Sequence, residues 1–145
     1  MTIWFDMDGT IADLYNVEGW LDYLIAGDTT PYEQAGVMLN MSKLARLLNT
    51  LQHQGCKLGI VSWTSKSGSE LYNGEVALTK LLWLHKHLRS VSWDYIKIVP
   101  YGTPKGELCK DGILFDDEEQ NRIDWCNEMA YPPEMIFEVL KELNK

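Results

Sequence analysis

Two carboxylates lie two residues apart near the start of the chain, Asp6 and Asp8, and Gly9 and Thr10 follow them. At the end of an extended strand, side chains two residues apart point to the same side. One carboxylate could attack phosphorus and form an aspartyl phosphate, while the other protonates the leaving oxygen and later deprotonates water. Crowding of like charges raises a carboxyl pKa, which would let Asp8 hold that proton. Gly9 would let the chain turn and its backbone approach a phosphate.

A second acidic pair, Asp116 and Asp117, follows a short apolar run far along the chain. Clustered carboxylates need a cation, and hard oxygen ligands around a phosphate suit Mg²⁺. Ser62 ends another apolar run and could donate a hydrogen bond to a phosphoryl oxygen. A lysine in the region of the Gly/Pro loop at 101–106, before the strand expected at 112–115, would supply positive charge to the site. Lys105 is the first choice and Lys110 the second.

Alternating apolar patterns predict the elements that must position these residues. Strands are expected at 2–5, 56–62, 95–99, 112–115 and 129–131. Helices are expected at 14–25, 41–54, 76–88, 118–127 and 133–143. Such alternation is typical of an α/β fold built from parallel β-α-β units, in which ligands bind beyond the carboxyl ends of the strands. Asp6, Ser62 and Asp116 each end a predicted strand, so we expect them to converge on one site.

Composition limits the class of partner. The chain has 145 residues and a formal charge of −8, which suits one domain and disfavours a nucleic-acid polymer as ligand. Its three cysteines form no paired motif, and no signal peptide or membrane-spanning run is recognisable. We therefore expect a cytoplasmic protein without membrane association that acts on a small phosphorylated substrate, and a homodimer is possible.

Taken together and in order, these segments resemble the four motifs of the haloacid dehalogenase-like (HAD) hydrolases. The residues that carry the resemblance are Asp6-Met7-Asp8-Gly9-Thr10, the strand-end Ser62, Lys105 and Asp116-Asp117. The resemblance implies a Rossmann-like, doubly wound parallel sheet with helices on both faces. It also implies a small helical cap inserted after the first strand, at about residues 14–40 of a single 1–145 domain.

The resemblance further implies a role for each matching residue. Asp6 would be the nucleophile and a metal ligand, and Asp8 the general acid/base and a ligand of Mg²⁺ through its backbone carbonyl. Lys105 would steady the phospho-aspartate, while Asp116 would bind the metal with Asp117 in support. Phosphate contacts are expected from residues after two strands, namely Gly9, Thr10, Ser62, Trp63 and Thr64.

Within the superfamily, the middle of the chain is most similar to the 5′(3′)-deoxyribonucleotidase type. The similar residues are Ser62-Trp63-Thr64-Ser65-Lys66, Lys80-Leu81-Leu82-Trp83-Leu84 with His87-Leu88, and Ile113-Leu114-Phe115-Asp116-Asp117. Two features depart from that type: the cap is shorter, and Lys66 stands where those enzymes have a proline. The resemblance implies a nucleotide phosphatase, with Thr64 competing with Ser62 as the phosphate-binding residue.

Other interpretations of the same residues stay open. The chain could be a non-catalytic binding or regulatory module on the same fold, or a phosphatase of nucleic-acid ends. Asp117 could cap the following helix instead of supporting a metal. In the expected cap, Trp20, Tyr23 and Tyr32 could stack on a base or sugar, although the pattern favours a place in the core.

Overall fold

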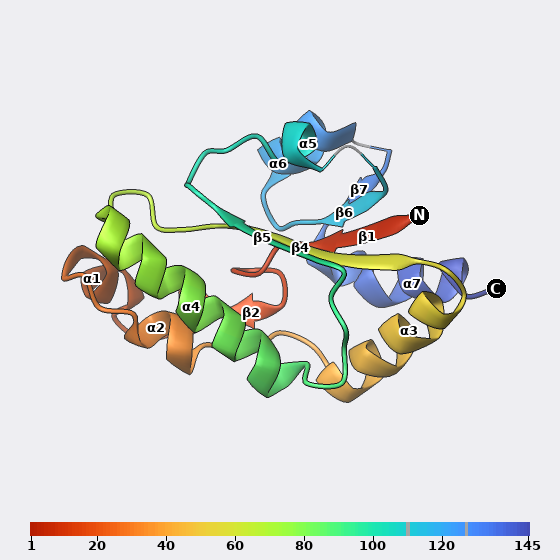
Figure 1. The fold of residues 1–145 in the computed structure, drawn as a ribbon, viewed down its shortest axis with the longest axis horizontal. Coiled ribbons are helices and arrows are strands. Elements are labelled where there is room, and N and C mark those ends of the chain that lie inside the picture. Colours follow the sequence, from red (N-terminus) through yellow and green to blue (C-terminus); the bar gives the residue numbers. More distant parts are fainter. Residues whose placement is uncertain (110, 127) are drawn as a thin grey trace.

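The protein is built on a five-stranded, fully parallel sheet, seen nearly edge-on in the computed structural model, which describes residues 1–109, 111–126 and 128–145 (Figure 1). The strands are β1 (Thr2–Phe5), β4 (Lys57–Trp63), β5 (Tyr95–Val99), β6 (Ile113–Phe115) and β7 (Ala130–Tyr131). Their order across the sheet is β5-β4-β1-β6-β7, so the first strand lies in the middle. The α/β fold expected from the alternating patterns is confirmed.

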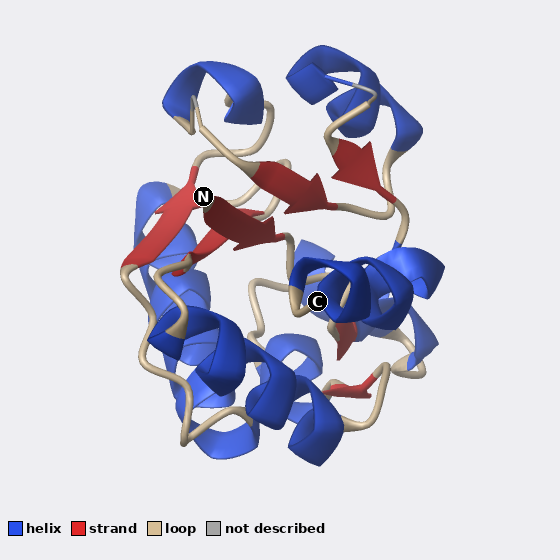
Figure 2. Cartoon of the chain, turned by 90° about the vertical axis from the view of Figure 1, so that its right-hand side faces the viewer, coloured by secondary structure: helices blue, strands red, loops and turns tan. Residues whose placement is uncertain are grey.

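Helices cover both faces of the sheet, which makes it doubly wound (Figure 2). On one face, α3 (Met41–His53), α7 (Ile136–Leu143) and the C-terminal part of α4 (Glu70–His87) pack against Ile3 and Phe5 of β1.

On the opposite face lie α5 (Lys105–Leu108) and α6 (Glu119–Cys126), whose Leu108 and Trp125 pack against Trp4 and Leu114. Alternate residues of β1 therefore enter different cores, as the pleat of a strand requires.

The crossover connections reverse direction at β1. After β1 the chain crosses by α3 to β4 on one side, whereas after β6 it crosses by α6 to β7 on the other side. Such a switch point opens a crevice at the carboxyl ends of the two central strands. Asp6 and Asp116, the residues directly after β1 and β6, therefore lie at this crevice.

A short segment between β1 and α3 stands above that edge of the sheet. A two-residue antiparallel ladder closes its base, pairing β2 (Ala12–Asp13) with β3 (Gly36–Val37). Between these strands lie a 3-10 helix η1 (Leu14–Asn16), α1 (Trp20–Ile25) and α2 (Thr30–Gln34). We call residues 14–35 the cap segment.

Three helix predictions need correction. The helix expected at 14–25 is interrupted, because Gly19 adopts a φ of +73° and α1 begins only after it. The last helix opens with a separate 3-10 turn, η2 (Pro133–Met135). For the helix expected at 41–54, serine is a favoured N-cap residue and its position predicts Ser42 as the cap, but the cap is Asn40, whose side chain accepts from Lys43 N.

The fourth helix, α4, starts at Glu70, six residues earlier than expected, where the Ser69 side chain caps it. The leucine spacing in 76–88 predicts an apolar face of Leu78, Leu81, Leu82 and Leu88, and this is wrong for the first three, which are exposed, while Leu88 is buried. The buried face carries Tyr72, Val76, Lys80, Trp83 and Leu84.

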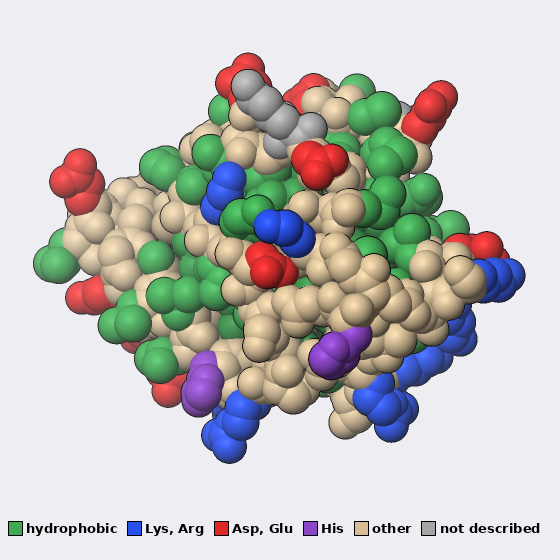
Figure 3. Space-filling view, turned by 45° about the vertical axis from the view of Figure 1, so that its right-hand side comes forward, with side chains coloured by type: hydrophobic (Ala, Val, Ile, Leu, Met, Phe, Trp, Pro, Cys, Tyr) green, Lys and Arg blue, Asp and Glu red, His purple; other side chains and the backbone are tan. Residues whose placement is uncertain are grey.

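Charge is distributed unevenly over the surface. On the face in Figure 3, Lys and Arg side chains gather toward the lower right, and acidic side chains are spread over the upper and left parts. None of the helices in the described part of the chain is both long enough and apolar enough to span a bilayer.

Candidate active site

The loop after β1 is a tight turn that fixes the first acidic pair. The carbonyl of Met7 accepts from the backbone N–H of Thr10, Ile11 and Ala12 at 2.9–3.0 Å. Gly9 adopts a φ of +79°, which favours glycine, and a Cβ there would collide with the side chains of Asp117 and Tyr15. Gly9 is therefore required because the second acidic pair packs directly against this turn.

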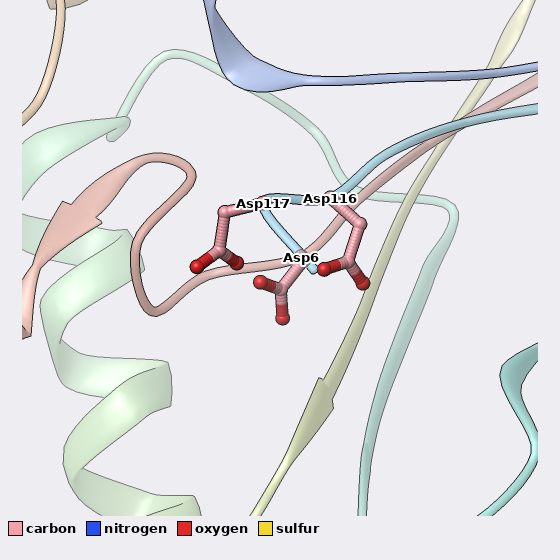
Figure 4. A group of neighbouring side chains, drawn as sticks. All are labelled: Asp6, Asp116 and Asp117. Carbon is pink, nitrogen blue, oxygen red and sulfur yellow. The ribbon is translucent and has the colours of Figure 1, made fainter. Parts of the chain in front are cut away.

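Three carboxylates from two strand ends converge at the switch point. Oxygens of Asp6, Asp116 and Asp117 lie within 4.8 Å of one another, and Figure 4 shows the three carboxylates pointing toward one centre. A hydrogen bond from Asp6 N to Phe115 O, 2.9 Å long, ties the two strand ends together. Of the three residues predicted to converge, Asp6 and Asp116 meet here, whereas Ser62 is buried and contacts Lys80 instead.

Lys105 neutralises part of this cluster. Its Nζ lies 3.0 Å from Asp6 Oδ1 and 2.7 Å from Asp116 Oδ2, and the side chain is almost fully buried. Burial alone would lower the pKa of Lys105, but the carboxylates of Asp6 and Asp116 raise it above its usual range, so the ammonium stays charged. The indole of Trp63 lies 5.0 Å from this ammonium and closes the cluster from the side.

Asp116 is held rigidly at the bottom of the site. It is fully buried, its Oδ1 accepts from Glu118 N at 2.9 Å, and its Oδ2 accepts from Asn121 Nδ2 at 3.2 Å. Burial and the neighbouring Asp6 raise the pKa of Asp116 to about 6, against the opposing effect of Lys105. The site therefore holds more negative charge than its one lysine compensates.

The pKa of Asp117 also reflects this excess of negative charge. Burial, then Asp6 and Asp116, raise the pKa of Asp117 to about 8. The Thr10 hydroxyl accepts from Asp117 N at 3.2 Å and donates to Asp6 Oδ2 at 3.1 Å. Thr10, predicted to bind phosphate, thus orients two carboxylates. Three hard oxygen donors with uncompensated charge fit a small divalent cation such as Mg²⁺.

Asp8 belongs to a separate network centred on Lys80. Lys80 Nζ, from α4, lies 2.8 Å from Asp8 Oδ2, 2.8 Å from Ser62 Oγ and 2.7 Å from Trp63 O. All three ammonium hydrogens are thereby used, and the side chain is 1% exposed. Burial raises the pKa of Asp8 and Lys80 opposes it, so Asp8 stands nearer to holding a proton than an ordinary aspartate.

The two candidates for phosphate contact at the end of β4 have different surroundings. Ser62 is 1% exposed and its Oγ accepts from Lys80 Nζ, whereas Thr64, the residue after β4, lines the cavity described below. Trp63 also lines the cavity and donates from its indole N–H to Thr103 O at 2.8 Å. Lys110, the second choice for the catalytic lysine, lies outside the described residues.

An open cavity of about 230 Å³ stands directly above the acidic cluster. Its floor includes Asp6, Asp8 and Lys105, and much of its wall comes from the cap segment. The wall is rich in aromatic side chains, namely Tyr15, Trp20, Tyr32, Trp63 and Tyr101. Tyr32 is buried and Trp20 half-buried at this wall, whereas Tyr23, grouped with them in the sequence, is exposed and lies outside it.

Sequence reasoning missed three residues of the site. Lys80 begins one of the stretches that resemble the deoxyribonucleotidase type, but it was assigned no role, because a helical lysine is usually on the surface. Asn121 follows the second acidic pair within the first turns of a predicted helix, and that spacing could have placed it beside Asp116. Tyr15 lies six residues after Gly9, and nothing in the pattern distinguished it from the other cap aromatics.

Comparison with solved structures supports the fold. The chain is similar to the crystal structure of D,D-heptose 1,7-bisphosphate phosphatase from Burkholderia thailandensis, with a TM-score of 0.53 and 16% sequence identity. The similarity covers 87% of this chain and 72% of that chain. No protein-family model matches the sequence, and neither does any curated protein. At 16% identity the likeness shows a shared fold, which agrees with the Rossmann-like architecture expected from the sequence.

Proposed function

We propose that this protein is a Mg²⁺-dependent phosphomonoesterase of the haloacid dehalogenase-like type, with Asp6 as the nucleophile. One observation carries the proposal: Asp6 shares a single site with Lys105, Asp116 and Asp117 at the switch point, and Asp8 stands beside it in a distinct network. Two acids with different environments can take two different roles. The shared fold with a structure described as a phosphatase is consistent with this activity.

In the first step, a carboxylate oxygen of Asp6 attacks phosphorus, and the bond from phosphorus to the leaving oxygen breaks. Protonated Asp8 gives its proton to that leaving oxygen, so an alcohol departs and an aspartyl phosphate remains. Lys105, in contact with Asp6, keeps positive charge beside the transferred group throughout.

In the second step, water attacks the phosphorus of the aspartyl phosphate while ionised Asp8 takes a proton from that water. The bond between phosphorus and Asp6 breaks, inorganic phosphate leaves and Asp6 is regenerated. Asp8 ends the cycle protonated, ready for the next substrate. Its partial burial and its contact with Lys80 allow it to alternate between both forms.

Asp6, Asp116 and Asp117 would hold the Mg²⁺, with the backbone carbonyl of Asp8 as a further ligand. When bound, Mg²⁺ would orient the phosphoryl group and offset its negative charge. For direct hydrogen bonding to the phosphate we favour Thr64 over Ser62, because Thr64 lines the cavity whereas Ser62 is buried behind it.

The cavity wall suggests the class of substrate. Aromatic rings above a phosphate-binding floor suit a leaving group with a flat ring, and a base stacked on an aromatic side chain contributes about 1–3 kcal/mol. We therefore propose a nucleoside monophosphate, or another small phosphomonoester with an aromatic group, as substrate.

The test is phosphate release from a panel of nucleoside monophosphates, sugar phosphates and an aryl phosphate, with Mg²⁺ and with chelator. Wild type should turn over at least one of them only with Mg²⁺, and Asp6→Asn should lower kcat more than about a thousandfold while substrate still binds. Asp22→Asn, an exposed acid of the cap segment, is the matched control and should stay active. Activity that survives in Asp6→Asn would refute the nucleophile, and a folded, Mg²⁺-binding protein that is inert toward the whole panel would favour a binding module.

A further inference from the structure

The solvent face of α4 is apolar along most of its length. Four leucines on this face are exposed: Leu71 (78%), Leu78 (58%), Leu81 (41%) and Leu82 (61%). Gly74 and His85 lie on the same face and are exposed as well. We call these six residues the α4 stripe.

A helix that is apolar on both sides is normally buried on both sides. The opposite face of α4 is already packed, with Tyr72, Val76, Trp83 and Leu84 buried beneath it. Single exposed leucines need no explanation, but a continuous row of them marks an interaction surface. The stripe therefore indicates a partner that covers about 21 Å of helix, the distance from Leu71 to His85.

We propose that the partner is a second copy of this chain, packed with its α4 antiparallel to the first about a two-fold axis at Leu78. A two-fold interface brings the same patch of both copies together, so the patch must be complementary to itself. The α4 stripe meets this requirement in size, shape and charge.

The shapes of Gly74 and Leu82 complement each other in this arrangement. With the axis at Leu78, the two copies of Leu78 meet each other, and Leu82 of each copy faces Gly74 of the other. A Cβ built on Gly74 would find no atom within 4 Å, so there is open space over this glycine for a leucine to enter. A small residue opposite a large one allows two helices to approach closely.

The charges at the two ends of the helix are complementary as well. The first turn of α4 contains Glu70, and the last turn contains His85, Lys86 and His87. In the antiparallel arrangement Glu70 of each copy faces Lys86 of the other, at both ends of the interface. The helix dipoles also oppose each other, which favours antiparallel packing. In a parallel arrangement like charges would meet instead.

Sedimentation of the full chain over a range of concentrations tests the proposal. Wild type should form a dimer, and Leu78→Lys should raise its dissociation constant at least about tenfold, because two buried lysines would meet at the axis. Ile123→Lys is the matched control, since Ile123 is 51% exposed but lies on α6, across the sheet. The control should dimerise like wild type. The proposal would be overturned if wild type stayed monomeric at hundreds of micromolar, or if Leu78→Lys left the dissociation constant of the dimer unchanged.

A charge exchange tests the antiparallel register. Glu70→Lys alone places a lysine against Lys86 of the other copy, and Lys86→Glu alone places two glutamates together, so each variant should dimerise roughly tenfold more weakly. Mixing the two variants should restore dimerisation, because each end of the mixed dimer then pairs a lysine of the first variant with a glutamate of the second. The double variant Glu70→Lys/Lys86→Glu also restores an opposite-charge pair at both ends, and it should dimerise with near wild-type affinity. Misfolding of either single variant would not produce that rescue, and failure of the double variant to recover would contradict the register.

Discussion

The residue that most changes the picture of the site is Lys80. It occupies a buried position of α4 and links Asp8 to Ser62 and to the backbone of Trp63, with distances of 2.7–2.8 Å. Its ammonium also stands over Tyr32 of the cap segment, 5.2 Å from the ring centre. Lys80 contacts Asp8, the proposed acid, and does not line the cavity, so we treat it as a positioning residue for Asp8.

Lys80→Met should therefore impair proton transfer more than substrate binding. Without the ammonium, the Asp8 carboxyl loses its only cationic contact among the described residues, and we expect kcat to fall roughly 10–100-fold with KM little changed. The loss should be greater for alkyl phosphates, whose leaving groups need a proton, than for aryl phosphates. Steady-state rates on one ester of each kind measure this difference.

Two further variants provide a comparison for the effect of Lys80→Met. Asp8→Asn should show the same preference in stronger form, because it removes the acid itself. Ser62→Ala removes one acceptor of Lys80 but leaves the contact with Asp8, so it should cost less activity than Lys80→Met. Equal losses on aryl and alkyl esters in Lys80→Met would mean that the lysine only stabilises the fold.

At this scale, sequence reasoning succeeded where residues follow strands. Asp6 and Asp116 were placed correctly because the carboxyl ends of adjacent parallel strands share one edge. It failed where a side chain reaches the site from a helix, as Lys80 does, since its role depends on three-dimensional packing. The choice between Ser62 and Thr64 needed the same information, because the packed structure shows that Ser62 is buried while Thr64 lines the cavity.

Among the elements, the cap segment has the most direct consequence for function. It supplies Tyr15, Trp20 and Tyr32 to the cavity wall, and the ladder between β2 and β3 anchors its base beside the loop after β1. Tyr15 also packs against Gly9, so the segment contacts the catalytic loop directly. The cap segment is therefore placed to contact the part of a substrate that lies beyond the phosphate.

Trp20→Ala should weaken recognition of a substrate that carries a base. We expect KM for a nucleoside monophosphate to rise roughly tenfold, as the loss of one stacking contact implies, with kcat less affected. KM for a sugar phosphate without a base should change little. Tyr23→Ala is the control, because Tyr23 belongs to the same helix α1 but does not line the cavity. An equal rise of KM for both substrates would argue against stacking.

The elements also show why their boundaries were harder to predict than their existence. The strands at 2–5 and 95–99 were predicted with the same bounds that the structure shows, because each is a short, mainly apolar run of residues. The helix at 14–25 was predicted as continuous, although the positive φ of Gly19 divides it. The first six residues of α4 were missed because Gly74 and two polar residues, Asn73 and Glu75, weaken the apolar period there.

For the molecule as a whole, the order of strands was beyond sequence reasoning. Alternation of strands and helices predicts parallel pairing, but not the side on which each crossover passes. The switch between β1 and β6 follows from α3 and α6 lying on opposite faces, which depends on how all the helices share the sheet (Figure 1). That switch is what concentrates three carboxylates at one point.

This concentration of charge should make the stability of the metal-free protein depend on pH. The folded-state pKa values of Asp116, about 6, and Asp117, about 8, lie above the unfolded value near 3.8. The folded state therefore binds more protons than the unfolded state between roughly pH 4 and pH 8, so stability should fall as pH rises through that window. Without Mg²⁺, the melting temperature should be lower at pH 8 than at pH 5.

Asp117→Asn separates this electrostatic effect from general acid or base denaturation. The variant keeps the shape of the side chain but removes one of three crowded charges, so at pH 8 without metal it should be more stable than wild type by on the order of 1 kcal/mol. Mg²⁺ binds the deprotonated carboxylates, so it should raise the melting temperature of wild type more at pH 8 than at pH 5. The increase in melting temperature that Mg²⁺ causes should be smaller for Asp117→Asn than for wild type. Thermal unfolding of both proteins at the two pH values, with Mg²⁺ and with chelator, measures all of these differences. If metal-free Asp117→Asn were less stable than wild type at pH 8, the three carboxylates would not repel one another, and a cation at this site would lose its electrostatic basis.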